Sequence, residues 1–139
     1  MSDVELSDDH DRLDLERVHS WLTTSYWSPG VSREKVAAAA RGSQVVGAYD
    51  RSGQIGYARL VTDTATYAWL CDVWVAQEAR GRGVGRLVVE RCLERCREWG
   101  VRRVMLATKD AHGLYESNAF TPLEVRRFLE LRLAQEPAD

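Results

Sequence analysis

The chain has 139 residues, of which 45% are hydrophobic, so we expect one continuous core and a single domain over residues 1–139. A formal net charge of -2 argues against a protein that coats nucleic acid through a basic field, and it is compatible with cationic substrates. No apolar run approaches the roughly 20 residues that span a bilayer, and the acidic start MSDVELSDDHDR lacks the features of a signal peptide. We therefore expect a cytoplasmic protein with no membrane and no nucleic-acid partner.

Two helices are expected in the first third of the chain. Residues 11–27 place apolar side chains on one helical face, with Asp9 or Asp11 as the N-cap. A second helix begins after the N-cap Ser32, runs through a row of strong helix formers and ends at Gly42.

The middle of the chain changes to the pattern of strands and then returns to a helix. Three segments, 44–50, 54–62 and 66–76, are rich in Val, Ile, Tyr and Trp and are separated by turn residues, which predicts three antiparallel strands. Apolar residues then recur every three or four positions up to Gly100, a suitable C-terminal cap, so a long helix is expected.

Shorter elements are expected towards both ends. Residues 102–108 resemble a buried strand, residues 110–120 a short helix, and residues 127–133 a closing strand of alternating apolar and polar side chains. A short strand near residues 4–6 completes the order (β)ααβββαβαβ, and the ends, 1–8 and 134–139, are expected to be loose.

The three cysteines do not suggest a disulfide framework, because their number is odd and no export signal precedes them. Cys92 and Cys96 lie four residues apart on one expected helix face. Two thiols without a histidine motif fall short of four zinc ligands, so we expect apolar packing there and no metal site. We expect all three, including Cys71, to be reduced.

A turn rich in glycine and arginine separates the third of these strands from the long helix. A glycine turn before a helix presents unpaired backbone N–H groups and the positive end of the helix dipole at one point. The pattern therefore predicts a binding site for pyrophosphate, formed by Arg80, Gly81, Arg82, Gly83, Val84, Gly85 and Arg86.

Two well-known phosphate-binding motifs do not fit the turn. A P-loop needs Gly-Lys-Ser/Thr, but Gly85 is followed by Arg86 and Leu87. A G-x-G-x-x-G fingerprint also fails from either possible start. Two further readings stay open: an Arg-Gly segment that contacts RNA, and a turn whose glycines only permit tight packing while its arginines are solvated.

Two motifs in sequence order resemble the GNAT superfamily of acetyl-CoA-dependent N-acetyltransferases. Residues 80–85, RGRGVG, match the family signature Q/R-x-x-G-x-G/A, and AHGLYESNAF, residues 111–120, is similar to A-x-x-x-Y-x-x-x-G-F. The resemblance covers most of the chain and is closest to small bacterial members. It implies an α+β (α/β) fold with a central, mixed, mostly antiparallel twisted sheet flanked by helices. The chain departs from the family pattern at Gln77, Thr108 and Ala119, where proline, asparagine and glycine are common.

The resemblance also implies roles for individual residues. The main chain of Val73 and Val75 is expected to bind the pantetheine arm and thioester oxygen of acetyl-CoA. Tyr115, at the tyrosine of the second motif, is expected to protonate the leaving thiolate, since a phenol pKa of about 10 is close to that of a thiol, about 8.5. The amine must lose a proton to water or to a carboxylate, for which Asp72 is a candidate and Asp63 and Glu78, near strand ends, are alternatives.

An acceptor pocket is expected beside these groups. Trp21, Tyr26, Trp27 and Trp69 are candidates for aromatic walls around a cationic amine, whereas Trp74 is interpreted as ordinary core. Strand alternation sends Trp69 and Trp74 to different faces unless a bulge intervenes. The expected function is acetyl transfer from acetyl-CoA to a primary amine of a small molecule or protein, directly in a ternary complex, by a monomer or homodimer. The alternative is a non-catalytic module of the same fold that senses acyl-CoA.

Overall fold

The computed structural model describes residues 3–133, so the expected loose end at 134–139 lies outside the described residues. The chain divides into two compact units, Met1–Lys109 and Asp110–Asp139. The larger unit holds a five-stranded sheet in the order β1-β2-β3-β4-β5. The strands are Glu5–Ser7, Gln44–Asp50, Gly53–Thr62, Ala68–Val75 and Val104–Met105.

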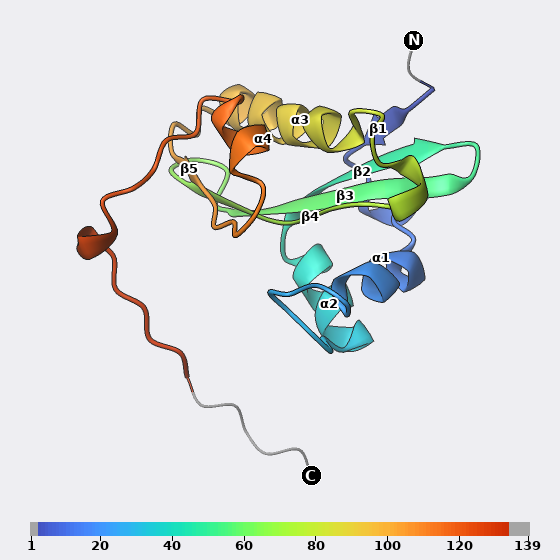
Figure 1. Cartoon of the computed structure of the whole chain (residues 1–139), viewed down its shortest axis with the longest axis horizontal. Coiled ribbons are helices and arrows are strands. Elements are labelled where there is room, and N and C mark those ends of the chain that lie inside the picture. Colours follow the sequence, from blue (N-terminus) through green and yellow to red (C-terminus); the bar gives the residue numbers. More distant parts are fainter. Residues whose placement is uncertain (1–2, 134–139) are drawn as a thin grey trace. The chain divides into compact units, whose positions relative to one another are not determined.

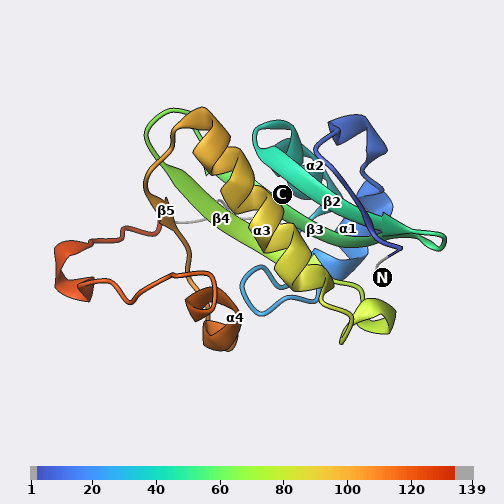
Figure 2. The same cartoon turned by 90° about the horizontal axis from the view of Figure 1, so that it is seen from above.

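The sheet is mixed and mostly antiparallel, as predicted. β1, β2, β3 and β4 pair antiparallel in sequence, and only β5 runs parallel to its neighbour β4. Helices cover both faces: α1 (Leu15–Leu22) and α2 (Arg33–Arg41) lie on one face, and α3 (Val84–Trp99) crosses the other (Figures 1 and 2). The α+β fold class is therefore confirmed.

Local caps define the helices, with one correction. Ser32 accepts a hydrogen bond from the amide of Lys35 at the start of α2, and Gly100 ends α3 in a left-handed conformation, both as predicted. The cap of α1 is Asp14, neither Asp9 nor Asp11: Asp9 caps a separate 3-10 turn. The amide of Asp14 donates to Gln54 Oε1 across 2.8 Å, so a tertiary contact with β3 decides where the helix begins.

Two apolar layers hold the helices on the sheet. The layer under α1 and α2 consists of Val18, Leu22, Val36, Ala40, Val45 and Tyr57. On the other face, α3 packs on β2, β3 and β4 and buries Cys92 and Cys96, so the predicted apolar role of these two thiols is confirmed. Each fully buried large side chain contributes about 1.5–3 kcal/mol. All three cysteines are free.

A glycine on β3 allows the start of α3 to lie close to the sheet. A Cβ at Gly56 would lie 3.1 Å from Val84 Cγ1 and 3.2 Å from Ala48 Cβ, which is tighter than ordinary contact. Val84, the first residue of α3, is itself fully buried. The absence of a side chain at Gly56 thus fixes the position of the predicted pyrophosphate turn relative to the sheet.

The two ends of the chain differ from expectation. Glu5–Ser7 form the short strand predicted near residues 4–6 and pair with β2, and Asp8 forms an ion pair with Arg91 across 2.6 Å, so residues 5–8 are not loose, contrary to the expectation for residues 1–8. The strand expected over 102–108 is reduced to the two residues of β5.

The closing strand expected over 127–133 is absent from the structure. The smaller unit contains α4 (His112–Glu116) and the 3-10 turn Val125–Arg127, and residues 128–133 are not paired with any described strand. Leu129 is 99% exposed and Leu131 82% exposed. Alternation of apolar residues defines a face, but a strand also needs a neighbour for its backbone hydrogen bonds, and the described residues 110–133 hold none.

Candidate functional site

The sheet opens between β4 and β5. The two strands pair only at Ala68 with Val104 and at Trp69 with Met105, whereas β4 continues to Val75. The amide of Ala76 donates to the carbonyl of Ile55 on β3, 2.8 Å away. Because main-chain groups alternate along a strand, the N–H of Val75 and the C=O of Val73 therefore point away from β3, into this opening. These are the two residues whose main chain was predicted to bind the pantetheine arm.

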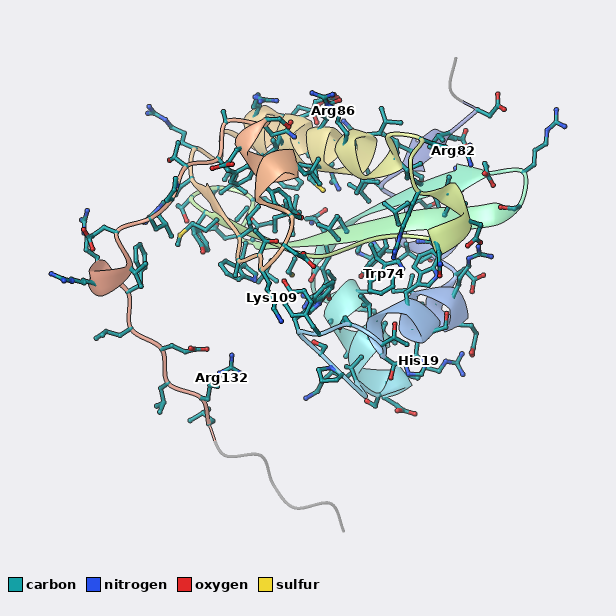
Figure 3. The ribbon with its side chains drawn as sticks, in the orientation of Figure 1. His19, Trp74, Arg82, Arg86, Lys109 and Arg132 are labelled. Carbon is teal, nitrogen blue, oxygen red and sulfur yellow. The ribbon has the colours of Figure 1, made fainter. Side chains whose placement is uncertain are left out.

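A β-bulge at Asp72 changes the direction of the side chains on β4. The register with β3 shifts between Tyr57 and Arg59, and Asp72 has a φ of 56°, in the left-handed region. Without the bulge, Trp69 and Trp74 would lie on opposite faces. With it, Trp74 lies opposite Tyr57 and packs on the cluster beneath α1 and α2 (Figure 3). Trp69 lies opposite Val61, which is on the same face of β3 as Tyr57, so Trp69 shares this face.

Both carboxylate oxygens of Asp72 accept hydrogen bonds from neighbouring side chains. Arg59 Nε donates to Oδ2 across 2.6 Å, and Trp27 Nε1 donates to Oδ1 across 2.8 Å. The side chain of Asp72 is only 11% exposed and that of Arg59 only 20%. Arg59 Nη1 also donates to Ser43 Oγ across 3.0 Å. The predicted base is thus the centre of a network that attaches the loop of Trp27 to β4.

The predicted pyrophosphate turn has an open helix end. Gly83, the N-cap of α3, has a φ of 79°, and Gly81 has a φ of 82°. A Cβ at either glycine would meet nothing within 4 Å. The first hydrogen bond within the helix runs from the amide of Leu87 to the carbonyl of Gly83, and no side chain caps the N-terminus. The N–H groups of Val84, Gly85 and Arg86 are therefore left for a ligand, and the helix dipole adds positive potential there.

The three arginines of the turn have different neighbours. Arg80 Nε donates to the carbonyl of Val75 across 3.1 Å, and its guanidinium lies over the ring of Trp74. Arg82 pairs with Asp50 across 3.2 Å, and Arg86 pairs with Glu90 on the next turn of α3 across 3.3 Å. Arg82 and Arg86 lie at the start of α3 (Figure 3). The side chains of both Arg82 and Arg86 are exposed, so their guanidinium groups can exchange partners for phosphate oxygens.

Aromatic side chains form a row along the α1 and α2 face of β4. The rings of Tyr26 and Trp27 meet edge to face at 5.0 Å, and Trp27 lies 6.1 Å from Trp74. The ammonium of Lys109 lies 5.4 Å from the centroid of Tyr26, whose hydroxyl accepts a hydrogen bond from the amide of Lys109 across 2.8 Å. Of the predicted pocket residues, Tyr26 and Trp27 thus come together, and they are joined by Trp74.

The other predicted pocket residues occupy different surroundings. Trp21 belongs to the layer beneath α1 and α2, and its ring is covered by the guanidinium of Arg17 at 5.5 Å. Arg17 also binds Glu78 across 2.6 Å, which links α1 to the segment before the glycine turn. Trp69 is partly buried beside the end of β5.

Tyr115, the predicted acid, lies in the smaller unit. It is in α4, is 8% exposed, and meets Phe120 edge to face at 5.8 Å. Its carbonyl accepts the amides of Asn118 and Phe120, so the residues after α4 turn around it.

Sequence reasoning did not identify Arg59 and Lys109 as site residues. Arg59 carries a signal, because an arginine within the apolar strand segment YARLV must find a buried partner. Lys109 gives none, since a single lysine after a strand is ordinary. Within residues 3–133, no helix is long and apolar enough to cross a membrane, and no three of the His, Cys, Asp and Glu side chains are grouped to hold a metal ion.

Comparison with known proteins agrees with this geometry. Residues 8–120 match the model of the "Acetyltransferase (GNAT) family". A GNAT-family protein from Xanthomonas campestris pv. campestris is 34% identical, with a TM-score of 0.89 over 96% of this chain and 95% of that one. A GNAT acetyltransferase from Streptococcus pneumoniae TIGR4 shares the fold, with a TM-score of 0.70, 21% identity and coverage of 96% and 98%.

A candidate acetyltransferase from Gibberella zeae is 38% identical over 66 residues, which are 47% of this chain and 37% of the relative. The chain thus matches little more than a third of that protein. The family model, by contrast, matches well over half of this chain, and the relative from Xanthomonas is matched over nearly its whole length. The chain therefore belongs to the GNAT family of acetyltransferases.

Proposed function

We propose that the protein transfers the acetyl group of acetyl-CoA to a primary amine of a small molecule or protein, directly in a ternary complex. The observation that carries this proposal is the opening between β4 and β5 in the same unit as the uncapped start of α3. The first offers main-chain groups to an extended amide-containing arm, and the second offers N–H groups to a diphosphate. Together they suit the pantetheine arm and the diphosphate of CoA.

The residues present fit acetyl-CoA. Gly81 and Gly83 leave open space where side chains would cover the helix end, and Arg82 and Arg86 supply exposed positive charge beside it. Val73 and Val75 supply the C=O and N–H that would pair with the pantetheine arm and hold the thioester oxygen. Arg80, already bonded to the carbonyl of Val75, holds the turn against β4 as well as adding charge.

When bound, acetyl-CoA supplies a thioester whose carbonyl carbon forms a bond with the amine nitrogen while its C–S bond breaks. Tyr115 then donates its phenolic proton to the departing sulfur, and the proton lost by the amine passes to water and restores the phenol. The N–H groups at the opening of the sheet polarise the carbonyl, so the main chain supplies the electrophilic assistance.

We assign to Asp72 a positioning role in place of the base. The charge of Asp72 is already balanced by Arg59, and both of its oxygens accept hydrogen bonds, so an amine would have to compete with Arg59 and Trp27 for this carboxylate. From its position at the bulge, Asp72 instead holds the ring of Trp27 by a hydrogen bond on the face of β4 that carries the aromatic row. The chain then has no carboxylate assigned to deprotonation, which is why water takes that part.

Replacing Tyr115 with phenylalanine tests the proposed chemistry. We expect the release of free CoA thiol with reactive amines to fall by roughly 100-fold or more, because general acid catalysis contributes about that much. Tyr49→Phe is the matched control: Tyr49 is also 8% exposed, and among the described residues its hydroxyl has no hydrogen-bond partner. Calorimetry with CoA should give equal affinities for both variants. Full thiol release by Tyr115→Phe would refute the role of Tyr115.

A second candidate is a non-catalytic sensor of acyl-CoA. The observation that favours it is that both oxygens of Asp72, the predicted base, already accept hydrogen bonds from Trp27 and Arg59. One experiment distinguishes the two functions. If acetyl-CoA binds and no amine of a broad set releases thiol, the sensor stands and the enzyme fails.

A further inference from the structure

Cations of the chain itself occupy the aromatic row defined by Tyr26, Trp27 and Trp74. At one end the ammonium of Lys109 lies over Tyr26, and at the other the guanidinium of Arg80 lies over Trp74, 5.5 Å from the ring centroid. Lys109 is one of only two lysines in the sequence. In Figure 3, Lys109 and Trp74 lie on the same side of the sheet. The rings therefore already have the positive partners that a cationic substrate would otherwise provide.

The charges around the row are not balanced by acid. Within residues 3–133, no carboxylate lies within ion-pairing distance of Lys109 or Arg80. The one carboxylate that contacts the row is Asp72, which is bonded to Trp27 and neutralised by Arg59. An incoming dication or polyamine would meet positive charge at both ends of the row and find no free anion. An anionic group would find two cations without a carboxylate partner, of which Arg80 is hydrogen-bonded to the carbonyl of Val75 and Lys109 lies at the other end of the row.

We propose that the acceptor is an amine that also carries a carboxylate, and that Lys109 is the residue that binds this carboxylate. This inference rests on the proposed function and names its substrate class. The hydrogen bond between the amide of Lys109 and Tyr26 Oη holds the backbone of residue 109 at the Tyr26 end of the aromatic row, so its ammonium stays beside the row. The aromatic rings then contact the apolar part of the acceptor.

The test compares amines that differ in the carboxylate alone. We would measure kcat/KM for 4-aminobutyrate against butylamine, whose amino groups have similar pKa values, and for phenylalanine against 2-phenylethylamine. The ratio within each pair is measured for the wild type, for Lys109→Gln and for Lys35→Gln. Lys35, the other lysine of the chain, is exposed on α2. Lys35→Gln removes the same charge at a different place, so it is the matched control.

We expect the wild type to favour the aminocarboxylate in each pair. Lys109→Gln should lower this ratio about fivefold, the effect of one exposed ion pair, through the KM of the aminocarboxylate. The KM values of butylamine and acetyl-CoA should be the same in Lys109→Gln as in the wild type. The ratio for Lys35→Gln should equal that of the wild type. An equal ratio in wild type and Lys109→Gln overturns the proposal, as does a rise in the KM of acetyl-CoA alone, which would assign Lys109 to the cofactor.

A binding measurement separates this inference from the proposed function. CoA-saturated protein is titrated with 4-aminobutyrate and with butylamine in a calorimeter. The inference is supported if the wild type binds the aminocarboxylate more tightly and Lys109→Gln loses this preference. This holds even if no amine is acetylated, a result that would refute only the proposed enzymatic function. Equal binding of the two compounds to the wild type overturns the inference, while turnover of both would leave the enzyme standing.

Discussion

Replacing Gly83 with alanine tests the helix end as a diphosphate site, because the structure separates its two effects. Gly83 has a φ of 79°, and an added Cβ meets nothing within 4 Å, so the fold bears only the backbone strain of a left-handed alanine. That strain is about 1–2 kcal/mol. Gly100, at the other end of α3, has a φ of 80° and is equally open, so Gly100→Ala carries the same strain. Both variants should therefore lose a similar 2–8 °C or so in Tm.

Their affinities for CoA should differ. The Cβ at position 83 would enter the open space beside the start of α3, where the diphosphate is proposed to bind, and each charge-assisted hydrogen bond lost costs about 1.5–3 kcal/mol. Gly83→Ala should weaken CoA binding roughly 10- to 100-fold by calorimetry, and Gly100→Ala should leave it unchanged. Equal CoA affinities in the two variants would refute the assignment, since both carry the same strain.

Two further predictions concern the groups beneath the site. Asp72→Asn should lower the free energy of unfolding by about 2 kcal/mol in urea titrations, because it leaves the largely buried Arg59 without its charge partner; it should also raise the KM of the amine more than it lowers kcat. A large loss of kcat at unchanged stability would instead indicate that Asp72 is the general base. Burial raises the pKa of Cys71 to about 11 and also raises the pKa of Tyr57. The folded protein thus keeps protons that the unfolded chain releases, so its Tm should fall as the pH rises from the ordinary thiol range, about 8.5, towards 11, and Cys71 should react slowly with iodoacetamide at pH 8. A Tm that rises over this range, or rapid alkylation of folded protein, would contradict the burial of these groups.

Elements with local signals were predictable. The second helix and α3 have their caps, Ser32 and Gly100, within the sequence of the element, and β2 matches its expected bounds, Gln44–Asp50. Elements that depend on a partner were not. Asp14 caps α1 because Gln54 holds its amide, a contact between residues far apart in the sequence. The strand expected over 127–133 has the right alternation but no neighbour among the described residues of its unit.

The site divides in the same way. The glycine turn before α3 could be predicted from the sequence, because its glycines and the helical periodicity that follows them are local features. The bulge could not, since a left-handed aspartate leaves no mark in the sequence, and it is the bulge that brings Trp69 and Trp74 to one face. The partners of Asp72 and the neighbours of Lys109 depend on loops whose path the sequence does not encode locally.

The most direct measurement of the central claim is the change in backbone amide signals of residues 81–86 in ¹⁵N NMR spectra as CoA is added, with pantetheine as the ligand that lacks the diphosphate. We expect the amides of Val84, Gly85 and Arg86 to shift strongly with CoA and to remain in place with pantetheine. CoA binding without a shift at these amides, or equal shifts with both ligands, would contradict it.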